Sequence, residues 1–160
     1  MTPEQAVQQL NALLDDSMSG IRPPLRYWDG WPRSTEQSAT GLYEQSLGYA
    51  TATRDRYVMT KVARAKYGAL LGVVEHSWLA KGYTITAVNP NQPAIFATTP
   101  AGAAIAITFG APGNITFTAS VGPIPVIRDR DPFGVPTPEP VMANGNLDVL
   151  PRYEDPFWSA

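Results

Sequence analysis

Few side chains in this sequence are suited to acid–base or nucleophilic chemistry. His76 is the only histidine, and the chain has no cysteine. Glu75 precedes His76, but neighbours in a helix point about 100° apart, so the two do not form a ready pair. A lone histidine makes a poor metal site, and a general base needs an orienting partner. We therefore predict no catalytic residue, no cofactor and no metal site, and an enzyme is the third of three functional hypotheses.

Basic side chains are concentrated between residues 54 and 66. Such a cluster could bind an anion or a nucleic acid. Alternatively, it is a solvated strand end followed by the first turn of a helix. The net charge of −2 and the pI of about 5.3 favour the second interpretation and predict no nucleic-acid partner. The members of this basic cluster are Arg54, Arg56, Lys61, Arg64 and Lys66.

Three aromatic residues, Tyr27, Trp28 and Trp31, flank Asp29 and form a second candidate site. Exposed rings of this kind stack on sugars or anchor a protein partner. Alternate aromatic residues also commonly pack into a core, and the sequence leaves both interpretations open. We call these three residues the aromatic set.

The elements that position these residues belong to a chain of 160 residues, 44% of them hydrophobic, which suits one domain with a sizeable core. No stretch has the roughly 20 apolar residues of a membrane-spanning helix. The first ten residues lack the basic and apolar layout of a signal peptide. The absence of cysteine excludes disulfides but does not decide the compartment.

The N-terminal residues predict a short helix. Thr2 is suited to the N-cap, Pro3 to the first helical position, and Gln5 completes a capping box. Apolar residues then repeat at helical spacing until the helix ends near residues 19–20. This apolar stripe consists of Ala6, Val7, Leu10, Leu13 and Leu14.

The next segment predicts extended structure interrupted by a loop. Residues 25–31 read as an extended segment with a turn at Asp29 and Gly30, and residues 33–40 read as a polar loop. Residues 42–59 are rich in Tyr, Thr, Val and Leu, which favours one long strand, or two strands broken near Gly48.

A long helix is expected over residues 62–81. Its apolar positions follow the spacing i, i+3, i+4, i+7 and i+11, and Gly82 suits the helix end. Gly68 and Gly72 would let this helix approach a sheet closely. The apolar positions are Tyr67, Leu70, Leu71, Val74 and Trp78.

The following 46 residues, 82–127, contain no charged side chain. They read as four consecutive strands, at residues 83–88, 94–98, 103–109 and 115–121, separated by turns rich in Pro, Gly and Asn. The third of these has apolar residues on both sides, which predicts a strand near the centre of the sheet or one under a cover. Since exposed sheet faces normally carry charge, the second face must either be built from Thr, Ser and Asn or be covered.

Half of the sixteen prolines fall within residues 122–160, which favours an extended tail. We expect residues 1–121 to form one α+β domain and the Pro-rich tail to pack on it. The predicted fold is an antiparallel sheet with the long helix across one face, the short N-terminal helix beside it and the tail outside.

The segment RYVMTKVARAKYGALLGVVEHSWLAKGYTITAVNP, residues 56–90, resembles small uncharacterised lipoproteins of actinobacteria. In these proteins a strand leads through Thr-Lys-Val into a helix, then to Lys-Gly-Tyr and a strand that ends in Asn-Pro. The resemblance covers residues 25–121, and the closing residues 155–159, DPFWS, also resemble the ends of these proteins. It implies an envelope location and lipid on a cysteine near the start of the mature chain. This sequence has no cysteine, so such an anchor is absent or was removed, and the family brings no established activity.

Two hypotheses of different classes follow from these patterns. The first is a non-enzymatic protein of the cell envelope or exterior, which binds a glycan, a cell-wall component or a protein through the uncharged face or the aromatic set. The second is a cytosolic interaction module, such as an inhibitor or immunity-type protein, which uses the basic cluster against an acidic partner.

Overall fold

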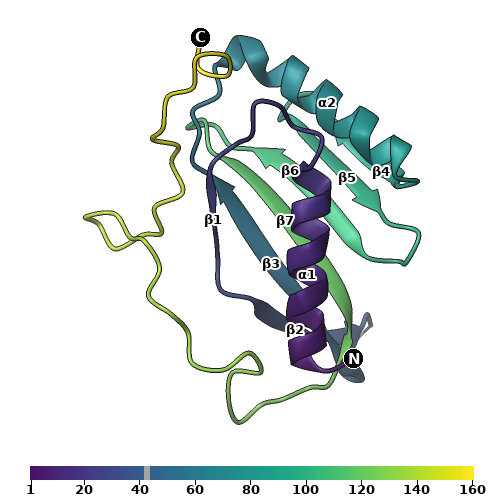
Figure 1. The fold of residues 1–160 in the computed structure, drawn as a ribbon. Coiled ribbons are helices and arrows are strands. Elements are labelled where there is room, and N and C mark those ends of the chain that lie inside the picture. The colour runs from purple at the N-terminus through teal and green to yellow at the C-terminus, as the bar shows by residue number, and fades with distance from the viewer. Residues whose placement is uncertain (42–43) are drawn as a thin grey trace.

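The computed structural model describes residues 1–41 and 44–160 and contains one antiparallel sheet with two helices on one of its faces (Figure 1). The strands are ordered β1-β3-β7-β6-β5-β4, and β2 pairs with β3. The predicted α+β class is therefore confirmed. The helices are α1 (Pro3–Met18) and α2 (Tyr67–Ala80), and the strands are β1 (Tyr27–Asp29), β2 (Arg33–Ala39), β3 (Gln45–Val58), β4 (Thr84–Asn89), β5 (Ala94–Thr98), β6 (Ala104–Phe109) and β7 (Ile115–Ile124).

Helix α1 begins as its sequence predicts. The backbone N–H of Gln5 donates to Thr2 Oγ1 at 3.1 Å, and the N–H of Thr2 donates to Gln5 Oε1 at 2.9 Å. These two bonds are the reciprocal pair of a capping box, so the helix start is determined by residues within one turn. Of the predicted stripe, Val7 is half-buried and the rest is buried.

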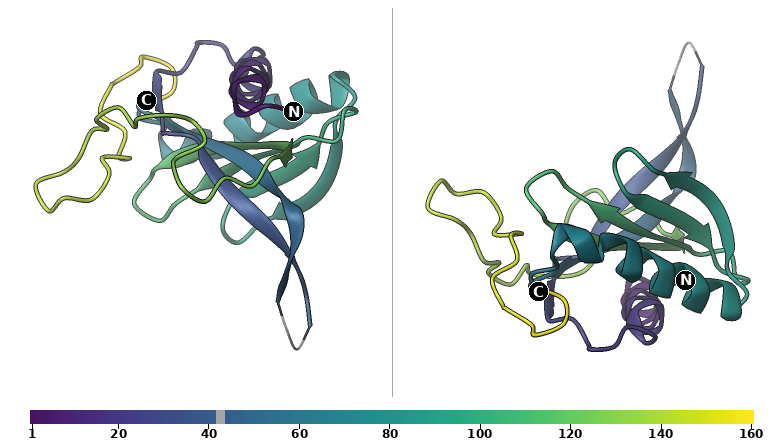
Figure 2. Two further views of the ribbon diagram at one scale, coloured as in Figure 1. Left: turned by 90° about the horizontal axis from the view of Figure 1, so that it is seen from below. Right: turned by 90° about the horizontal axis from the view of Figure 1, so that it is seen from above.

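The prediction of a polar loop over residues 33–40 is wrong, because Arg33–Ala39 forms strand β2. Its partner β3 is one continuous strand that passes through Gly48, where φ is +82°. The β2–β3 hairpin projects beyond the sheet on the side away from the helices (Figure 2). Much of β2 is solvated, so it lacks the apolar alternation by which strands are recognised. Residues 42 and 43, the start of the predicted strand, lie outside the described residues.

The second helix begins slightly later than the start predicted near residue 62. A short 3₁₀ turn, Arg64–Lys66, precedes α2, and Ala63 is extended with φ −62° and ψ 144°. The tail holds this segment open, since the N–H of Lys61 donates to the carbonyl of Tyr153 and the N–H of Ala63 to that of Trp158, both at 2.7 Å. The two bonds continue the parallel bridge between Thr60 and Tyr153, so the segment is paired with the tail in an extended conformation up to Ala63.

Helix α2 buries Leu70, Val74 and Trp78 against the sheet, as its spacing predicts. Gly68 and Gly72 do not mediate this approach. Both are exposed, and a Cβ added at either position would meet no atom within 4 Å. The close packing therefore comes from the apolar side chains alone.

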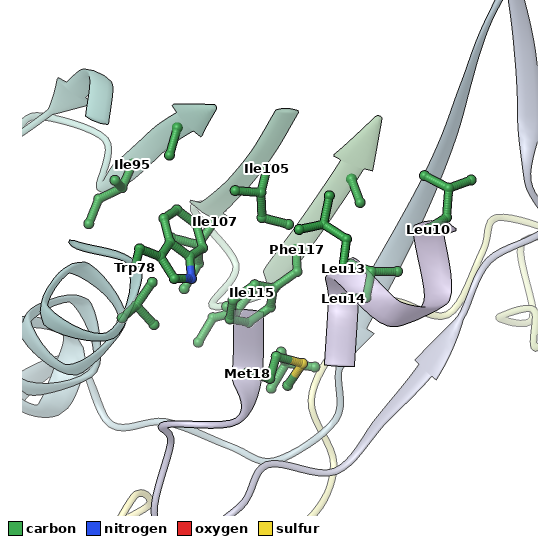
Figure 3. Close-up of a cluster of buried hydrophobic side chains, with 14 of the residues drawn as sticks. Leu10, Leu13, Leu14, Met18, Trp78, Ile95, Ile105, Ile107, Ile115 and Phe117 are labelled. Carbon is green, nitrogen blue, oxygen red and sulfur yellow. The ribbon is translucent and has the colours of Figure 1, made fainter. Parts of the chain in front are cut away.

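The four predicted strands of the uncharged segment are β4 to β7, which pair in chain order as a meander. One face of β7 is buried and the other half-exposed, and β6 lies between β5 and β7 as expected for a central strand. The buried side chains of β5, β6 and β7 meet those of α1 and α2 in a single core (Figure 3). The residues labelled there are Leu10, Leu13, Leu14, Met18, Trp78, Ile95, Ile105, Ile107, Ile115 and Phe117.

The C-terminal tail, residues 125–160, has turns and isolated bridges in place of helices or strands. It passes beside the β1 edge of the molecule in both views of Figure 2. Trp158 near its end is 1% exposed and belongs to the core, and Tyr153 forms a parallel bridge with Thr60.

Neither of the two described helices combines the length and the apolar composition needed to cross a bilayer.

Candidate binding surface

On the face of the sheet opposite the helices, Phe96 and Thr98 of β5 and Ala104 of β6 are exposed, and no residue of the tail lines the hollow beside them. The side chains of this face form three rows across β5, β6, β7 and β3, because directly paired residues share a face. We call these rows the open face. They are Ala94, Thr108, Thr116 and Tyr57; Phe96, Ala106, Thr118 and Asp55; and Thr98, Ala104, Ser120 and Thr53.

On β5, β6 and β7 the open face consists of methyl and hydroxyl groups around one large aromatic ring. Phe96 is 41% exposed, whereas a phenylalanine in a sheet is usually buried. A shallow hollow of about 340 Å³ lies around this ring and is lined by Thr98, Ala104, Thr118 and Ser120 among others. The missing charge of this segment is therefore explained by a face built from small neutral side chains, rather than by self-burial.

A second hollow, of about 420 Å³, adjoins the first on the same face. The two share Ala104 and Ser120, and the second adds Tyr49 and Thr51 of β3. Tyr49 is 40% exposed. Two exposed rings thus border one continuous uncharged surface.

The one charged residue of the open face, Asp55, is paired with other side chains of the protein. Asp55 accepts a hydrogen bond from Thr118 Oγ1 at 2.7 Å and pairs with Arg33 Nη1 at 2.6 Å. Burial raises the pKa of the neighbouring Tyr57 hydroxyl, and the negative charge of Asp55 raises it further. Tyr57 is therefore kept neutral over the physiological range, and the face presents little net charge to a ligand.

The aromatic set lies at the β1 edge, where the structure uses it to hold other parts of the chain. The Trp28 indole Nε1 donates to the carbonyl of Asp148 at 3.1 Å, and that of Trp31 donates to Asp131 Oδ2 at 3.0 Å. The Tyr27 ring is 45% exposed, with the Arg56 guanidinium 3.9 Å from its centroid. Trp28 and Trp31 thus anchor the tail, and both are only partly exposed.

Strand alternation turns Arg54 and Arg56 toward the helices, where internal partners engage them. Arg54 donates to Asn11 Oδ1 at 2.7 Å, and Arg56 is 3% exposed. Burial by itself would lower the pKa of Arg56, but its hydrogen bonds and charge attraction to Asp29 outweigh this, so the pKa is raised. These two residues belong to the interior framework.

The remaining three members of the basic cluster lie near the start of α2. Lys61 pairs with Glu154 of the tail at 3.1 Å, and Lys66 lies 3.7 Å from the centroid of the Phe157 ring. Arg64 is exposed, and within residues 1–41 and 44–160 no carboxylate lies within ion-pair distance of it. The basic cluster therefore does not form one surface patch.

His76 is exposed on α2. No group of three or more acidic or histidine side chains that could hold a metal ion occurs in the described part of the chain.

The residues that sequence reasoning missed are Phe96, Tyr49 and Asp55. A signal for Phe96 was present, since it is the one bulky aromatic residue among small ones in β5 and points opposite to Ile95. Asp55 carried no such signal because its partners come from β2 and β7.

Comparison of the chain with protein-family models, curated proteins and solved structures found no match.

Proposed function

We propose that this protein is a non-enzymatic binding protein whose open face takes a neutral glycan. The observation that carries this proposal is an exposed Phe96 ring surrounded by uncharged hydroxyl and methyl groups on a face that the chain's own tail leaves uncovered.

The chemistry of the face suits a sugar. A pyranose presents an apolar C–H face for stacking on an aromatic ring, together with hydroxyl groups that exchange hydrogen bonds with Thr and Ser. Thr98 is exposed, and Thr108 and Thr116 are half-exposed, so their hydroxyls are within reach of a ligand. Ala104 has no bulk that would keep a flat ligand from the strands.

A charged ligand is less well matched to this surface. Strands β5, β6 and β7 have no charged side chain, and Asp55 is already bound by Thr118 and Arg33. Bringing an ion onto this face would remove its hydration without supplying a counter-charge.

The resemblance to small lipoproteins supports placing this binding protein at the cell envelope. The alternative of a cytosolic module that uses the basic cluster is weakened by the internal partners of Arg54, Arg56, Lys61 and Lys66.

Binding to a panel of neutral oligosaccharides and purified cell-wall polysaccharides tests the proposal. Phe96→Ala should weaken the affinity for a bound glycan at least about tenfold, because stacking is lost while the fold is kept. The matched control is Leu79→Ala, which truncates a 53% exposed apolar side chain on α2, and it should leave the affinity unchanged.

Failure of every neutral glycan to bind, or binding that is insensitive to Phe96→Ala, would overturn the proposal. Preferential binding of acidic glycans that persists in Phe96→Ala would assign recognition to a charged part of the surface. Site-specific cross-linking from position 96 that captures a defined protein, with no glycan bound, would replace the glycan by a protein partner.

A further inference from the structure

A cavity of about 480 Å³ lies at one end of the sheet, away from the open face. It is formed where the 3₁₀ turn and the start of α2 meet the β4–β5 and β6–β7 loops, which a meander places at the same end (Figure 1). None of its lining residues lines the two hollows of the open face. The lining residues are Arg64, Tyr67, Asn91, Gln92, Pro93, Phe109, Gly110 and Ala111.

Hydrogen bonds hold the two loops of this cavity in place. The N–H of Phe109 donates to the carbonyl of Pro93 at 3.0 Å, which ties one loop to the other. Asn89 Oδ1 accepts from the N–H groups of Asn91 at 3.0 Å and Gln92 at 3.2 Å. A ligand would therefore meet a cavity that is already formed, and little ordering of the loops would oppose binding.

The cavity carries positive charge. Arg64 lines it, no acidic residue does, and both loops belong to the uncharged segment. The other cations nearby are occupied, Lys61 by Glu154 and Lys66 by the Phe157 ring. One available guanidinium balances one negative charge, and its planar fork matches the two oxygens of a carboxylate. A phosphate carries up to about two charges and would call for a second free cation.

The rest of the lining is apolar or neutral. Tyr67 is the partly exposed ring of this lining, and Pro93 lines the cavity with it. Phe109 is 2% exposed and packs edge to face against Tyr67, with the ring centroids 4.6 Å apart. Asn91 and Gln92 add amide groups that can donate or accept hydrogen bonds. The accessible aromatic surface of the cavity therefore comes from Tyr67, and Arg64 lines the same cavity.

We propose that this cavity is a binding site for a small molecule that carries one carboxylate on a flat apolar group. Arg64 binds the carboxylate, and Tyr67 and Pro93 contact the apolar part, with Phe109 supporting the Tyr67 ring. The site is independent of the proposed glycan surface, and neither result bears on the other.

Amide chemical shifts recorded while benzoate is titrated into the full chain test this proposal. Benzoate should give saturable shifts at Asn91, Gln92, Gly110 and Ala111. The neutral analogue benzamide should bind at least about tenfold more weakly, because charge-assisted hydrogen bonds to Arg64 are lost.

Two variants give the matched comparison. Arg64→Gln should weaken benzoate binding at least about tenfold, since it removes the charge and keeps a polar side chain. Arg130→Gln removes an exposed guanidinium from the tail and should leave the affinity unchanged. Arg64 is exposed, so its replacement is compatible with folding, and amide shifts far from the cavity should remain those of the wild type.

Three results would overturn the proposal. They are shifts that do not saturate, shifts centred elsewhere on the protein, and equal affinity of Arg64→Gln and wild type for benzoate. Tighter binding of phenyl phosphate than of benzoate would overturn the assignment of a carboxylate ligand.

Discussion

The guanidinium of Arg56 binds the carboxylate of Asp29 through two hydrogen bonds, from Nε to Oδ1 at 2.7 Å and from Nη2 to Oδ2 at 3.1 Å. A third interaction joins Nη1 to Asp15 Oδ1 of α1 at 2.9 Å. Arg56 therefore connects β3, β1 and α1 at a point that is almost completely shielded from solvent.

Asp29→Ala should destabilise the protein by about 3 kcal/mol, because it leaves the buried guanidinium with only the exposed Asp15 as a carboxylate partner. Arg56→Met should cost less, since it removes the buried charge and keeps much of the packing volume. Urea unfolding of the two variants measures both values. A smaller loss for Asp29→Ala than for Arg56→Met would contradict this view of the pair.

The raised pKa of Tyr57 leads us to expect a loss of folding stability at alkaline pH. Burial and Asp55 raise the pKa of its hydroxyl, so the folded state favours the neutral form. The resulting stabilisation is complete below the unfolded-state pKa and is lost as pH rises through the higher folded-state pKa. Between about pH 8 and about pH 11, the free energy of unfolding should fall more in the wild type than in Tyr57→Phe.

Tyr83, whose pKa burial also raises, provides the comparison for Tyr57. Tyr83→Phe should flatten the same alkaline decline to a similar extent, and the double variant more than either single one. If the free energy of unfolding fell with pH in parallel for the wild type and Tyr57→Phe, the pKa of Tyr57 would be the same in the folded and unfolded states.

We expect the hydrogen bond of Trp31 to restrain the tail locally, with little effect on global stability. Trp31→Phe keeps an aromatic ring but loses the bond from Nε1 to Asp131. Trypsin should then cleave faster after the exposed Arg128 and Arg130, while the free energy of unfolding falls by only about 1 kcal/mol. Tyr27→Phe keeps its ring and should be cleaved at the wild-type rate. Equal cleavage of all three proteins would mean that this bond does not restrain the tail.

Because Trp158 is buried in the core, we expect the end of the chain to contribute to global stability. Its ring is 1% exposed, and Nε1 donates to the carbonyl of Pro23 at 2.7 Å. Trp158→Ala should cost at least about 3 kcal/mol, whereas Phe157→Ala, at a 43% exposed ring, should cost about 1 kcal/mol or less. Chemical denaturation monitored by circular dichroism compares the two, and equal losses would argue against docking of Trp158 in the core.

Local interactions made part of this fold predictable from the sequence. The capping box of Thr2 and Gln5 and the apolar stripe of α1 all lie within eighteen residues. The four strands of the meander could likewise be placed because the turns between them carry Pro, Gly or Asn and the last strand alternates between apolar and polar residues. A signal contained in a few neighbouring residues can be read without knowing what packs against them.

Tertiary contacts decided the rest. The chain stays extended up to Ala63, before the 3₁₀ turn and α2, where residues 60–63 pair with Tyr153 and Trp158 of the tail, about ninety residues away. Strand β2 escaped prediction because its pairing with β3, and not an apolar pattern of its own, gives it its conformation.

The candidate sites show the same division. The sequence by itself determined that residues 82–127 have no charge, and hence that strands β4 to β7 place no charged side chain on either face of the sheet. Only the tertiary structure decided that one of these faces stays open, that Trp28 and Trp31 hold the tail, and that Arg56 is buried while Arg64 lines a cavity. The physical reason is that exposure and pairing depend on segments far apart in the chain, which local spacing does not specify.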